Sequence, residues 1–323
     1  MNTILPSFAI VIEWENVLLA ELSGTVEMLR CLRKELRDVG GQDDQPEMII
    51  MYDSQRVSPD LIRGTIAQVF PGDSNLCATK LVATQGKRYY ELKNESLKHT
   101  NKDVVVFLDS DVVPEDGWLL SLLKAFCKPE VQVVCGNTFV LPKGLYGKAM
   151  ALFWFFPLRQ DEEGLIPAER FFANNVAFRR EVLRAFPFPD LPQFRGQCTE
   201  LARTLRTNGI DIHLHRSARV RHPLPNGWFH FVCRALCEGH DNQIEAQRLA
   251  DQEDTPTRNP LRRYWASLRE VYWSIRKNHA NVSLGWMGGV AAFGLAHSYF
   301  TLVLVGEILT SIRPSIVRRC FSI

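Results

Sequence analysis

The sequence predicts an α/β fold in which short apolar strands alternate with amphipathic helices around a largely parallel sheet. Apolar runs recur through the first third of the chain, and residues with helical apolar spacing separate them. The run KDVVVFLD is apolar on both faces, as a central parallel strand is. Ligands of such sheets bind beyond the carboxyl ends of the strands. A long apolar segment near the C-terminus adds membrane-associated helices to this fold class.

Each expected element follows from a local pattern of apolar residues and breakers. The strands are expected at residues 8–12, 47–53, 76–83 and 102–109, each an apolar run beside polar or turn residues. Helices are expected at residues 18–36, 59–70, 86–99 and 114–126. Gly40 and Gly41 end the first helix, and Pro114 suits the first turn of the last one.

Composition and charge exclude some functional classes. The chain of 323 residues carries 38 Lys and Arg against 36 Asp and Glu, so its formal charge of +2 provides no global field for nucleic acid. The 8 cysteines form no Cys-x-x-Cys pair, and the N-terminus lacks the pattern of a secretory signal. We therefore expect a cytoplasmic catalytic domain. Cys233 and Cys237 are expected to pack in a core and not to bind zinc.

Two aspartates separated by one serine follow the fourth strand. Asp109 and Asp111 therefore fall where ligands bind in an α/β sheet. Carboxylates without neighbouring Cys or His favour Mg²⁺ or Mn²⁺ over zinc, and a ribose is a second possible ligand. In the alternative interpretation Asp109 caps the next helix and Asp111 is merely solvated.

Three ordered segments resemble family 2 glycosyltransferases, which have a GT-A fold. They are GKRYYELKNESLKHTNKDVVVFLDSDVVPEDGWL, RFFANNVAFRREVLRAFPFPD and TELARTLRTNGIDIHLHRSARVRH. The resemblance covers roughly residues 8–225. Several motifs in the family's order are more specific than an isolated Asp-x-Asp.

The resemblance implies roles for individual residues. Donor-binding roles fall on Asn16, Asp53, Lys93, Asn94 and Asp109, metal-binding roles on Asp109, Asp111 and His222, and acceptor-binding roles on Asn174 and Asn175. Each has a simpler alternative. Asp53 is also a typical strand-end turn residue, His222 also fits an exposed position between basic neighbours, and the paired asparagines also suit a turn.

The chain departs from the family pattern at two places. The loop after the first strand reads IEWEN, in which only Asn16 resembles the family. Gln197 and Cys198 stand where many members carry Glu-Asp, whose Asp is the catalytic base. We hypothesise that Glu200 supplies the base and that Cys198 lines the pocket, with its thiol pKa lowered by a helix N-terminus. Alternatively, Glu200 is a surface residue that complements the helix dipole, and Asp190 is a weaker candidate for the base.

The C-terminal third suggests a membrane location. Residues 226–281 form a helical, basic and aromatic region, residues 282–306 a transmembrane helix and residues 307–323 a short basic tail. The segment 282–305 has no charged residue, and at about 1.5 Å per residue it can cross a core of about 30 Å. A buried or re-entrant helix is the alternative. A chain ending near residue 254 is expected to be soluble.

The resemblance thus implies a metal-dependent, inverting glycosyltransferase that moves a sugar from a nucleotide diphosphate donor to an acceptor hydroxyl. A lipid-linked or cell-envelope glycan would suit the expected anchor. A catalytically inactive nucleotide-sugar or glycan-binding scaffold is the main alternative, because the usual base is replaced. A nucleotidyltransferase would need a glycine-rich loop near the first strand, where IEWENVLLAE has no glycine.

Overall fold

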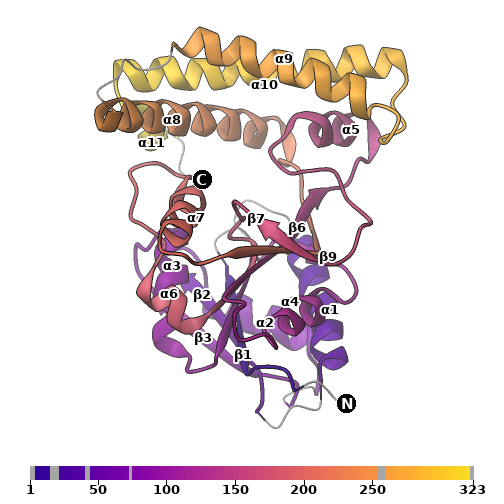
Figure 1. Ribbon diagram of the computed structural model, residues 1–323, viewed down its shortest axis with the longest axis vertical. Coiled ribbons are helices and arrows are strands. Elements are labelled where there is room, and N and C mark those ends of the chain that lie inside the picture. Colours follow the sequence, from indigo (N-terminus) through magenta and orange to yellow (C-terminus); the bar gives the residue numbers. More distant parts are fainter. Residues whose placement is uncertain (1–3, 15–21, 41–43, 73–74, 254–258, 321–323) are drawn as a thin grey trace. The chain divides into compact units, whose positions relative to one another are not determined.

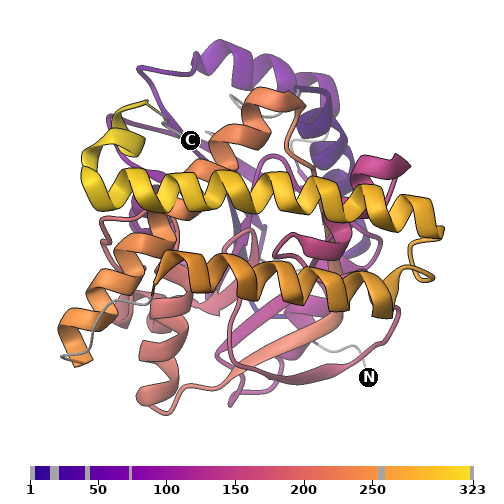
Figure 2. The same cartoon turned by 90° about the horizontal axis from the view of Figure 1, so that it is seen from above.

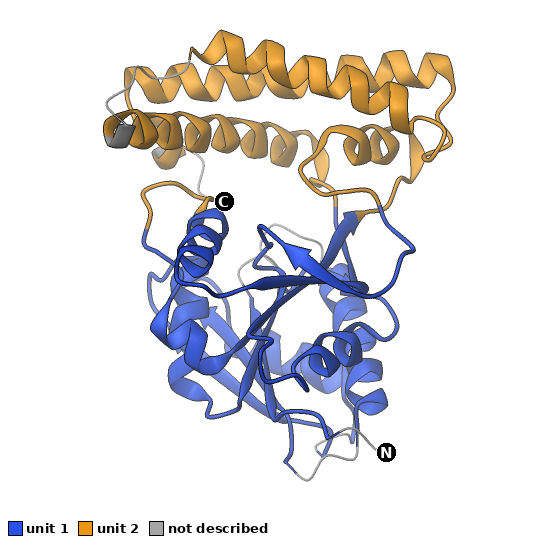
Figure 3. Ribbon diagram, in the orientation of Figure 1, with its two compact units in different colours: residues 1–139, 159–190, 197–223 blue, residues 140–158, 191–196, 224–323 orange. Residues whose placement is uncertain are grey.

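The computed structural model describes residues 4–14, 22–40, 44–72, 75–253 and 259–320. It has two compact units (Figure 3). Unit 1 comprises Met1–Phe139, Arg159–Asp190 and Gln197–Pro223, and unit 2 comprises Val140–Leu158, Leu191–Gly196 and Leu224–Ile323. Asn16, predicted to contact the donor, lies outside the described residues.

One mixed sheet runs through the α/β part of the chain (Figure 1). In the described residues its order is β3-β2-β1-β4-β8-β6-β9-β5, and β7 pairs with β9. The strands are β1 (Phe8–Glu13), β2 (Glu47–Asp53), β3 (Ala78–Thr84), β4 (Val104–Leu108), β5 (Val113–Pro114), β6 (Val133–Val140), β7 (Leu165–Ala168), β8 (Asn175–Arg179) and β9 (Ile212–His222).

The strands predicted from apolar runs are confirmed. β1, β2, β3 and β4 are parallel to one another, whereas β8 pairs antiparallel with both β4 and β6. The sheet is therefore parallel only in its N-terminal half. The antiparallel pairings join strands that are far apart in the sequence, so no local pattern announces them.

Helices cover both faces of the unit 1 part of the sheet. The helices are α1 (Leu22–Asp38), α2 (Pro59–Val69), α3 (Tyr89–Ser96), α4 (Trp118–Ala125), α6 (Arg180–Ala185) and α7 (Gln197–Thr207), with a 3₁₀ turn at Leu97–His99. Phe8, Ile10 and Ile12 pack with α1, α2 and α4, while Ala9 and Val11 pack with α3, α6 and α7. Successive side chains of β1 point to opposite faces of the sheet, so this one strand contributes to two apolar cores.

Pro114 does not begin a helix, which corrects the sequence prediction. It lies in β5, where Val113 and Pro114 pair with Arg221 and Val220 of β9. Helix α4 starts later, at Trp118, after Gly117 adopts a left-handed φ of 79°. Pro114 suits this short strand because only one of its edges is paired within the described sheet.

A carboxylate from α1 caps the N-terminus of α4. Glu35 accepts hydrogen bonds from the backbone nitrogens of Gly117 at 2.8 Å and Leu119 at 2.9 Å. Burial raises the pKa of Glu35, although these two N–H donors act in the opposite direction. The cap fixes the direction of the segment that follows the two candidate aspartates.

Unit 2 is largely helical. Its helices are α5 (Gly144–Phe153), α8 (Gly227–Glu253), α9 (Pro260–Asn278), α10 (Trp286–Ile312) and α11 (Ser315–Cys320). Figure 2 shows α9 and α10 running side by side. Among the described residues, only α10 is long and apolar enough to cross a membrane, by length and composition alone. It begins and ends later than the predicted span at 282–306.

Helices α8 and α10 cross in very close contact. A Cβ atom added to Gly239 would lie 2.0 Å from the carbonyl oxygen of Val303, and one added to Gly306 would lie 2.3 Å from that of Leu236. No side chain larger than hydrogen fits at either point. The packing of α8 against α10 therefore depends on both glycines.

Candidate active site

The candidate site lies at the carboxyl edge of the parallel strands. β1 ends at Glu13, β2 at Asp53, and β4 at Leu108, just before Asp109. The pairing of Val11 with Phe107, continued by two residues, places Glu13 level with Asp109. Polar side chains from separate strands therefore gather at one edge, where α/β sheets bind their ligands.

Asp109 is held by two side chains from α3. Lys93 Nζ lies 2.8 Å from Asp109 Oδ1, and the phenol of Tyr89 lies 2.8 Å from each carboxylate oxygen. The Lys93 ammonium also lies 4.4 Å from the centre of the Tyr89 ring and 5.0 Å from that of Phe107. These cation–π contacts help to stabilise a lysine whose side chain is fully buried.

Tyr89 acts as a hydrogen-bond donor in this arrangement. Burial raises the pKa of Tyr89 well above its usual value, and the negative charge of Asp109 raises it further. The phenol therefore stays protonated and donates to the carboxylate. Sequence reasoning missed Tyr89, although its position four residues before Lys93 places both side chains on one face of a helix.

Asp111 and His222 come from segments that the sheet places together. Val113 pairs antiparallel with Arg221, so the residues that precede β5 run alongside His222 at the end of β9. Asp111 is 7% exposed and His222 is 9% exposed. His222 Nδ1 lies 2.6 Å from the carbonyl oxygen of Pro223. Because a carbonyl oxygen only accepts, Nδ1 carries a proton in this contact, and Nε2 is the ring nitrogen that a neutral imidazole would offer to a metal.

This donor set fits a divalent cation that is completed by a ligand. No group of three or more His, Cys, Asp or Glu side chains able to hold a metal occurs among the described residues. Asp111 and His222 supply one carboxylate and one imidazole, and diphosphate oxygens are suitable additional ligands for Mg²⁺ or Mn²⁺. The Lys93 ammonium would repel a cation at Asp109, so the ion pair favours Asp109 as a donor contact over a metal ligand.

Ser110 lies between the two aspartates and points to an incomplete polar site. It is fully buried, and its hydroxyl has no hydrogen-bond partner among the described residues. Buried hydroxyls are normally hydrogen-bonded. An orphaned polar atom in this turn is consistent with a site whose polar contacts are completed by another group.

Asp53 ties together two loops at the same edge. One carboxylate oxygen accepts from the backbone nitrogen of Gln55 at 2.9 Å, and the other accepts from that of Gly86 at 3.2 Å. The first contact is the strand-end turn considered as an alternative for this residue. Its contact with a nucleotide base stays a prediction.

Two of the predicted amide residues make hydrogen bonds within the protein. The Asn94 side chain donates to the carbonyl oxygen of Phe188 at 2.8 Å and accepts from its nitrogen at 3.0 Å, so its amide is occupied within the protein. Asn175 is fully buried, accepts from Trp118 Nε1 and donates to the Ala218 carbonyl oxygen. These bonds stabilise the protein itself, and the donor contact of Asn94 and the acceptor contact of Asn175 stay predictions.

Asn174 keeps part of its hydrogen-bonding capacity. Its side-chain oxygen accepts from the hydroxyl of Thr138 at 3.0 Å, and the residue is 6% exposed. The amide nitrogen is not used by that bond. Asn174 therefore remains the better acceptor-binding candidate of the two asparagines.

Cys198 does not provide a thiolate, which corrects the expected effect of the helix N-terminus. It is the second residue of α7, but burial raises the pKa of its thiol to about 11, against the opposing hydrogen bond with Tyr90. The sulfur lies 3.5 Å from the Tyr90 hydroxyl. Loss of solvent around the thiolate outweighs the helix dipole at this position.

Glu200 points away from Cys198 on the same helix. Residues two apart on an α-helix differ in direction by about 200°. The Glu200 carboxylate lies 2.5 Å from the guanidinium of Arg203, and its side chain is 18% exposed. Asp190 is 79% exposed and pairs with Arg88. The geometry therefore gives Glu200 an ion-pair partner and gives Asp190 a surface position.

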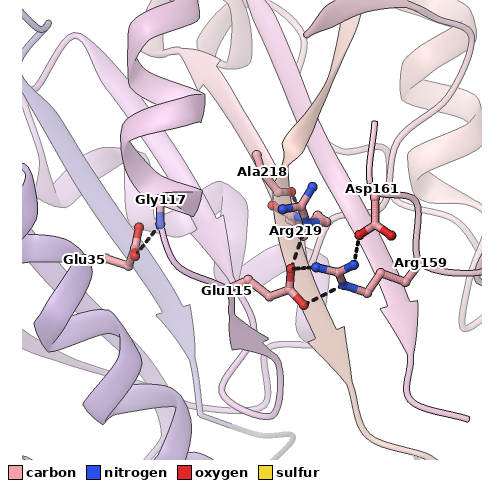
Figure 4. A network of polar contacts seen from close by, with 8 residues as sticks. Glu35, Glu115, Gly117, Arg159, Asp161, Ala218 and Arg219 are labelled. Atoms are coloured by element: carbon pink, nitrogen blue, oxygen red, sulfur yellow. Dashed lines mark hydrogen bonds and ion pairs between the residues drawn. The ribbon is translucent and has the colours of Figure 1, made fainter. Parts of the chain in front are cut away.

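An ion-pair cluster fixes the strand that carries His222 (Figure 4). Glu115 accepts from Arg219 Nε at 2.8 Å and from two nitrogens of Arg159 at 2.9 and 3.1 Å. Its backbone nitrogen also donates to the Arg219 carbonyl oxygen. Burial raises the pKa of Glu115, but the two guanidinium groups outweigh it and lower the pKa overall. Sequence reasoning did not identify this cluster, because its members lie far apart in the chain.

Comparison with known sequences identifies the family. The model of "Glycosyl transferase family 2" matches residues 27–186, about half of the chain. The chain is also 46% identical over 52 residues to the "Pre-mycofactocin glycosyltransferase" of two strains of Mycobacterium tuberculosis. That match covers 16% of this chain and 11% of the relative, so the chain spans about a tenth of the relatives' length.

Solved structures with a similar fold include a mannosyltransferase. A mannosyltransferase from Pyrobaculum calidifontis, in complex with GDP-Man and Mn²⁺, is 16% identical with a TM-score of 0.56, over 96% of this chain and 88% of that one. GalNAc-T7 with UDP, GalNAc and Mn²⁺ is 13% identical with a TM-score of 0.53, over 95% of this chain and 58% of that one. The chain therefore belongs to glycosyltransferase family 2 and has a GT-A fold.

Proposed function

We propose that the protein transfers a sugar from a nucleotide diphosphate donor to an acceptor hydroxyl, with a divalent cation at Asp111 and His222. The observation that carries this proposal is the antiparallel pairing of β5 with β9, because the buried Asp111 lies two residues before β5 and the buried His222 ends β9. We place the catalytic domain at residues 1–225, of which residues 140–158, 191–196 and 224–225 belong to unit 2. The neighbours bound to nucleotides and Mn²⁺ support the same assignment.

The protein's own residues position the donor and stabilise the charge that develops on the leaving group. Asp111 and His222 would hold Mg²⁺ or Mn²⁺, which as a Lewis acid neutralises charge on a departing nucleoside diphosphate. Lys93 and Tyr89 fix the carboxylate of Asp109, which accepts a hydrogen bond from a donor hydroxyl. Asp53 approaches the nucleotide base from the end of β2.

Transfer proceeds with inversion, by direct attack of the acceptor hydroxyl on the anomeric carbon. The bond from that carbon to the diphosphate oxygen breaks as the new glycosidic bond forms, and the hydroxyl proton must leave. Asn174 orients the acceptor, and Glu200 is the proposed proton acceptor, since the thiol of Cys198 is protonated at neutral pH. Release of Glu200 from Arg203 would be required.

A nucleotide-sugar-binding scaffold without transfer activity is the second candidate. One observation favours it: a protonated thiol occupies the position of the usual family base. The scaffold would retain the donor site and lack turnover. The two functions differ only in whether nucleoside diphosphate is released in the presence of an acceptor.

We also propose that the protein works at a membrane, with the catalytic domain on the cytoplasmic side and a lipid-linked or cell-envelope glycan as acceptor. The apolar helix α10 supports this location. A membrane-bound acceptor would be brought to the donor site by the same association.

A screen against nucleotide sugars tests the proposal. Purified protein is mixed with GDP- and UDP-linked sugars with and without Mn²⁺, and donor binding and release of nucleoside diphosphate are measured separately. Metal-dependent binding with release on addition of acceptors supports the enzyme. Binding without release of nucleoside diphosphate across broad acceptor panels favours the scaffold. If the protein binds none of the donors, both the enzyme and the scaffold are contradicted.

A further inference from the structure

Helix α9 presents one exposed face of arginines and aromatic residues. This α9 face consists of Leu261, Arg262, Trp265, Arg269, Tyr272, Trp273 and Arg276, all of them exposed. At about 100° per residue they fall within roughly one third of the helix circumference. The face contains no acidic residue, and Glu270, the only acid of α9, lies outside it.

The aromatic residues of this face are unusually exposed for their size. Trp265 is 65% exposed, Trp273 57% and Tyr272 46%. Arg276 lies 5.5 Å from the centre of the Trp273 ring and 5.9 Å from that of Tyr272. Tryptophan and tyrosine are enriched at the boundary between headgroups and acyl chains, where arginine meets lipid phosphate.

The exposed side of the neighbouring helix is free of charge. Its large apolar residues include Met287, Val290, Val305, Ile308 and Ile312, each at least 39% exposed. Glu307 is the only charged residue of α10, and it is buried, with an ion pair to Arg263 at 3.0 Å. Nothing charged therefore interrupts the exposed side of this helix.

The two helices pack antiparallel along most of their length. Arg263, near the start of α9, pairs with Glu307, near the end of α10, while a Cβ at Gly289 would touch Ile275, near the end of α9. Figure 2 shows the pair side by side, and no other helix of unit 2 covers them in that view. Both helices must therefore occupy the same environment.

This packing argues against a spanning α10. If α10 crossed the membrane with these contacts intact, α9 would cross beside it and place Arg262, Arg269 and Arg276 against hydrocarbon. Each costs about 2.5–3.5 kcal/mol at the centre of a membrane helix. A helix pair lying in the plane of the interface avoids that cost and still covers its apolar residues.

We infer that α9 and α10 form an in-plane docking surface for an anionic lipid bilayer. The α9 arginines contact lipid phosphates, and the aromatic rings with the exposed apolar residues of α10 enter the headgroup region. Phosphatidylglycerol-like lipids fit this surface better than zwitterionic lipids, because the face carries positive charge only. The inference rests on the proposed membrane location and is independent of sugar transfer.

Flotation of the full-length protein with lipid vesicles tests the lipid preference. We expect binding to phosphatidylcholine vesicles that contain phosphatidylglycerol and much weaker binding to phosphatidylcholine alone. Arg269→Gln/Arg276→Gln should weaken binding to the anionic vesicles roughly 30-fold, at about fivefold for each lost charge. The control Arg63→Gln/Arg184→Gln removes the same charge from residues 65% and 58% exposed on unit 1, and should bind as wild type does.

Labelling with a membrane-impermeant maleimide tests the orientation of α10. Asn281→Cys precedes α10, and the native Cys320 follows it; both positions are exposed. In sealed membrane vesicles, an in-plane α10 places both cysteines on the same side, whereas a spanning α10 places them on opposite sides. Peptide mapping separates these sites from the other cysteines.

The outcomes distinguish failure of the inference from failure of the location. The in-plane surface is overturned if binding depends on neither the lipid charge nor the α9 arginines and the two cysteines are labelled from opposite sides. That result still supports a membrane location. If the protein binds none of the vesicles, both the in-plane surface and the membrane location are overturned. A third outcome is a stable dimer that does not bind vesicles. If Trp265→Ala or Val305→Asn dissociates that dimer, the surface belongs to a second copy of the chain, and the inference is also overturned.

Discussion

Lys93 Nζ lies 2.8 Å from Asp109 Oδ1, and the side chains are 0% and 6% exposed. A buried charge that loses its partner costs about 3–5 kcal/mol. We therefore expect Lys93→Met to lower the free energy of unfolding by that amount, measured with urea. The double variant Lys93→Met/Asp109→Asn should recover part of the loss, since no unpaired charge remains. A single variant as stable as wild type would show that Asp109 needs no buried cation.

The proposed cation site predicts a specific loss of metal binding. Asp111→Asn and His222→Gln should each weaken Mn²⁺ binding in the presence of GDP or UDP by more than about 100-fold, because each removes a direct ligand. Titration followed by Mn²⁺ electron paramagnetic resonance measures this. Asp116→Asn is the control, since Asp116 is 81% exposed and pairs with Lys34. Equal Mn²⁺ affinity in wild type and both ligand variants would remove the site.

Glu115 predicts a pH-dependent contribution to stability. Glu115→Gln should cost about 1–2 kcal/mol at pH 7, since charge-assisted hydrogen bonds are lost but partial exposure screens them. The pKa of Glu115 is lowered from 4.5, so its contribution is complete above that pH and disappears as the pH falls through the lowered value. Urea unfolding at neutral and acid pH measures the difference.

The same variant should also weaken Mn²⁺ binding severalfold, because Glu115 fixes the strand that carries His222. The matched control is Glu27→Gln, which breaks the more exposed ion pair of Glu27 with Arg221 on the same strand. Equal effects of the two variants on Mn²⁺ affinity would argue that Glu115 has no special positioning role.

The base position predicts a gain of activity. If position 198 faces the acceptor, Cys198→Asp restores a carboxylate where the family base stands and should raise turnover at least tenfold. Cys198→Ala should change turnover little, because the protonated thiol is not a base. Glu200→Gln should abolish turnover if Glu200 accepts the proton. Unchanged turnover in Glu200→Gln, with a gain in Cys198→Asp, would indicate that the natural protein lacks a carboxylate base.

The parallel part of the fold could be predicted because its signals are local. β2 was predicted with the bounds that it has, since an apolar run between a loop and an acid leaves little choice. Pro114 was assigned to a helix because its strand consists of only two residues and depends on a partner more than 100 residues later. A local pattern of residues cannot predict such a pairing.

The same distinction applies to the site. Lys93 and Asp109 could be named as candidate residues because a helix and the following strand carry them, but their mutual ion pair was not predicted. The amides of Asn94 and Asn175 could not be assigned from the sequence, because their partners lie 94, 57 and 43 residues away. Burial also raises the pKa of the Cys198 thiol. This effect could not be predicted, because the sequence shows where the helix starts but not which apolar side chains surround the thiol.

The glycine crossing of α8 and α10 has a consequence for the order of synthesis. The ribosome completes α8 before α10, so the surface around Leu236 and Gly239 stays uncovered until the last turns of α10 emerge. A chain that stops after α8 should therefore aggregate or bind a hydrophobic dye, contrary to the solubility expected from the sequence. Premature termination would leave a nascent polypeptide that depends on a chaperone. Once α10 has been synthesised, it covers this surface of α8.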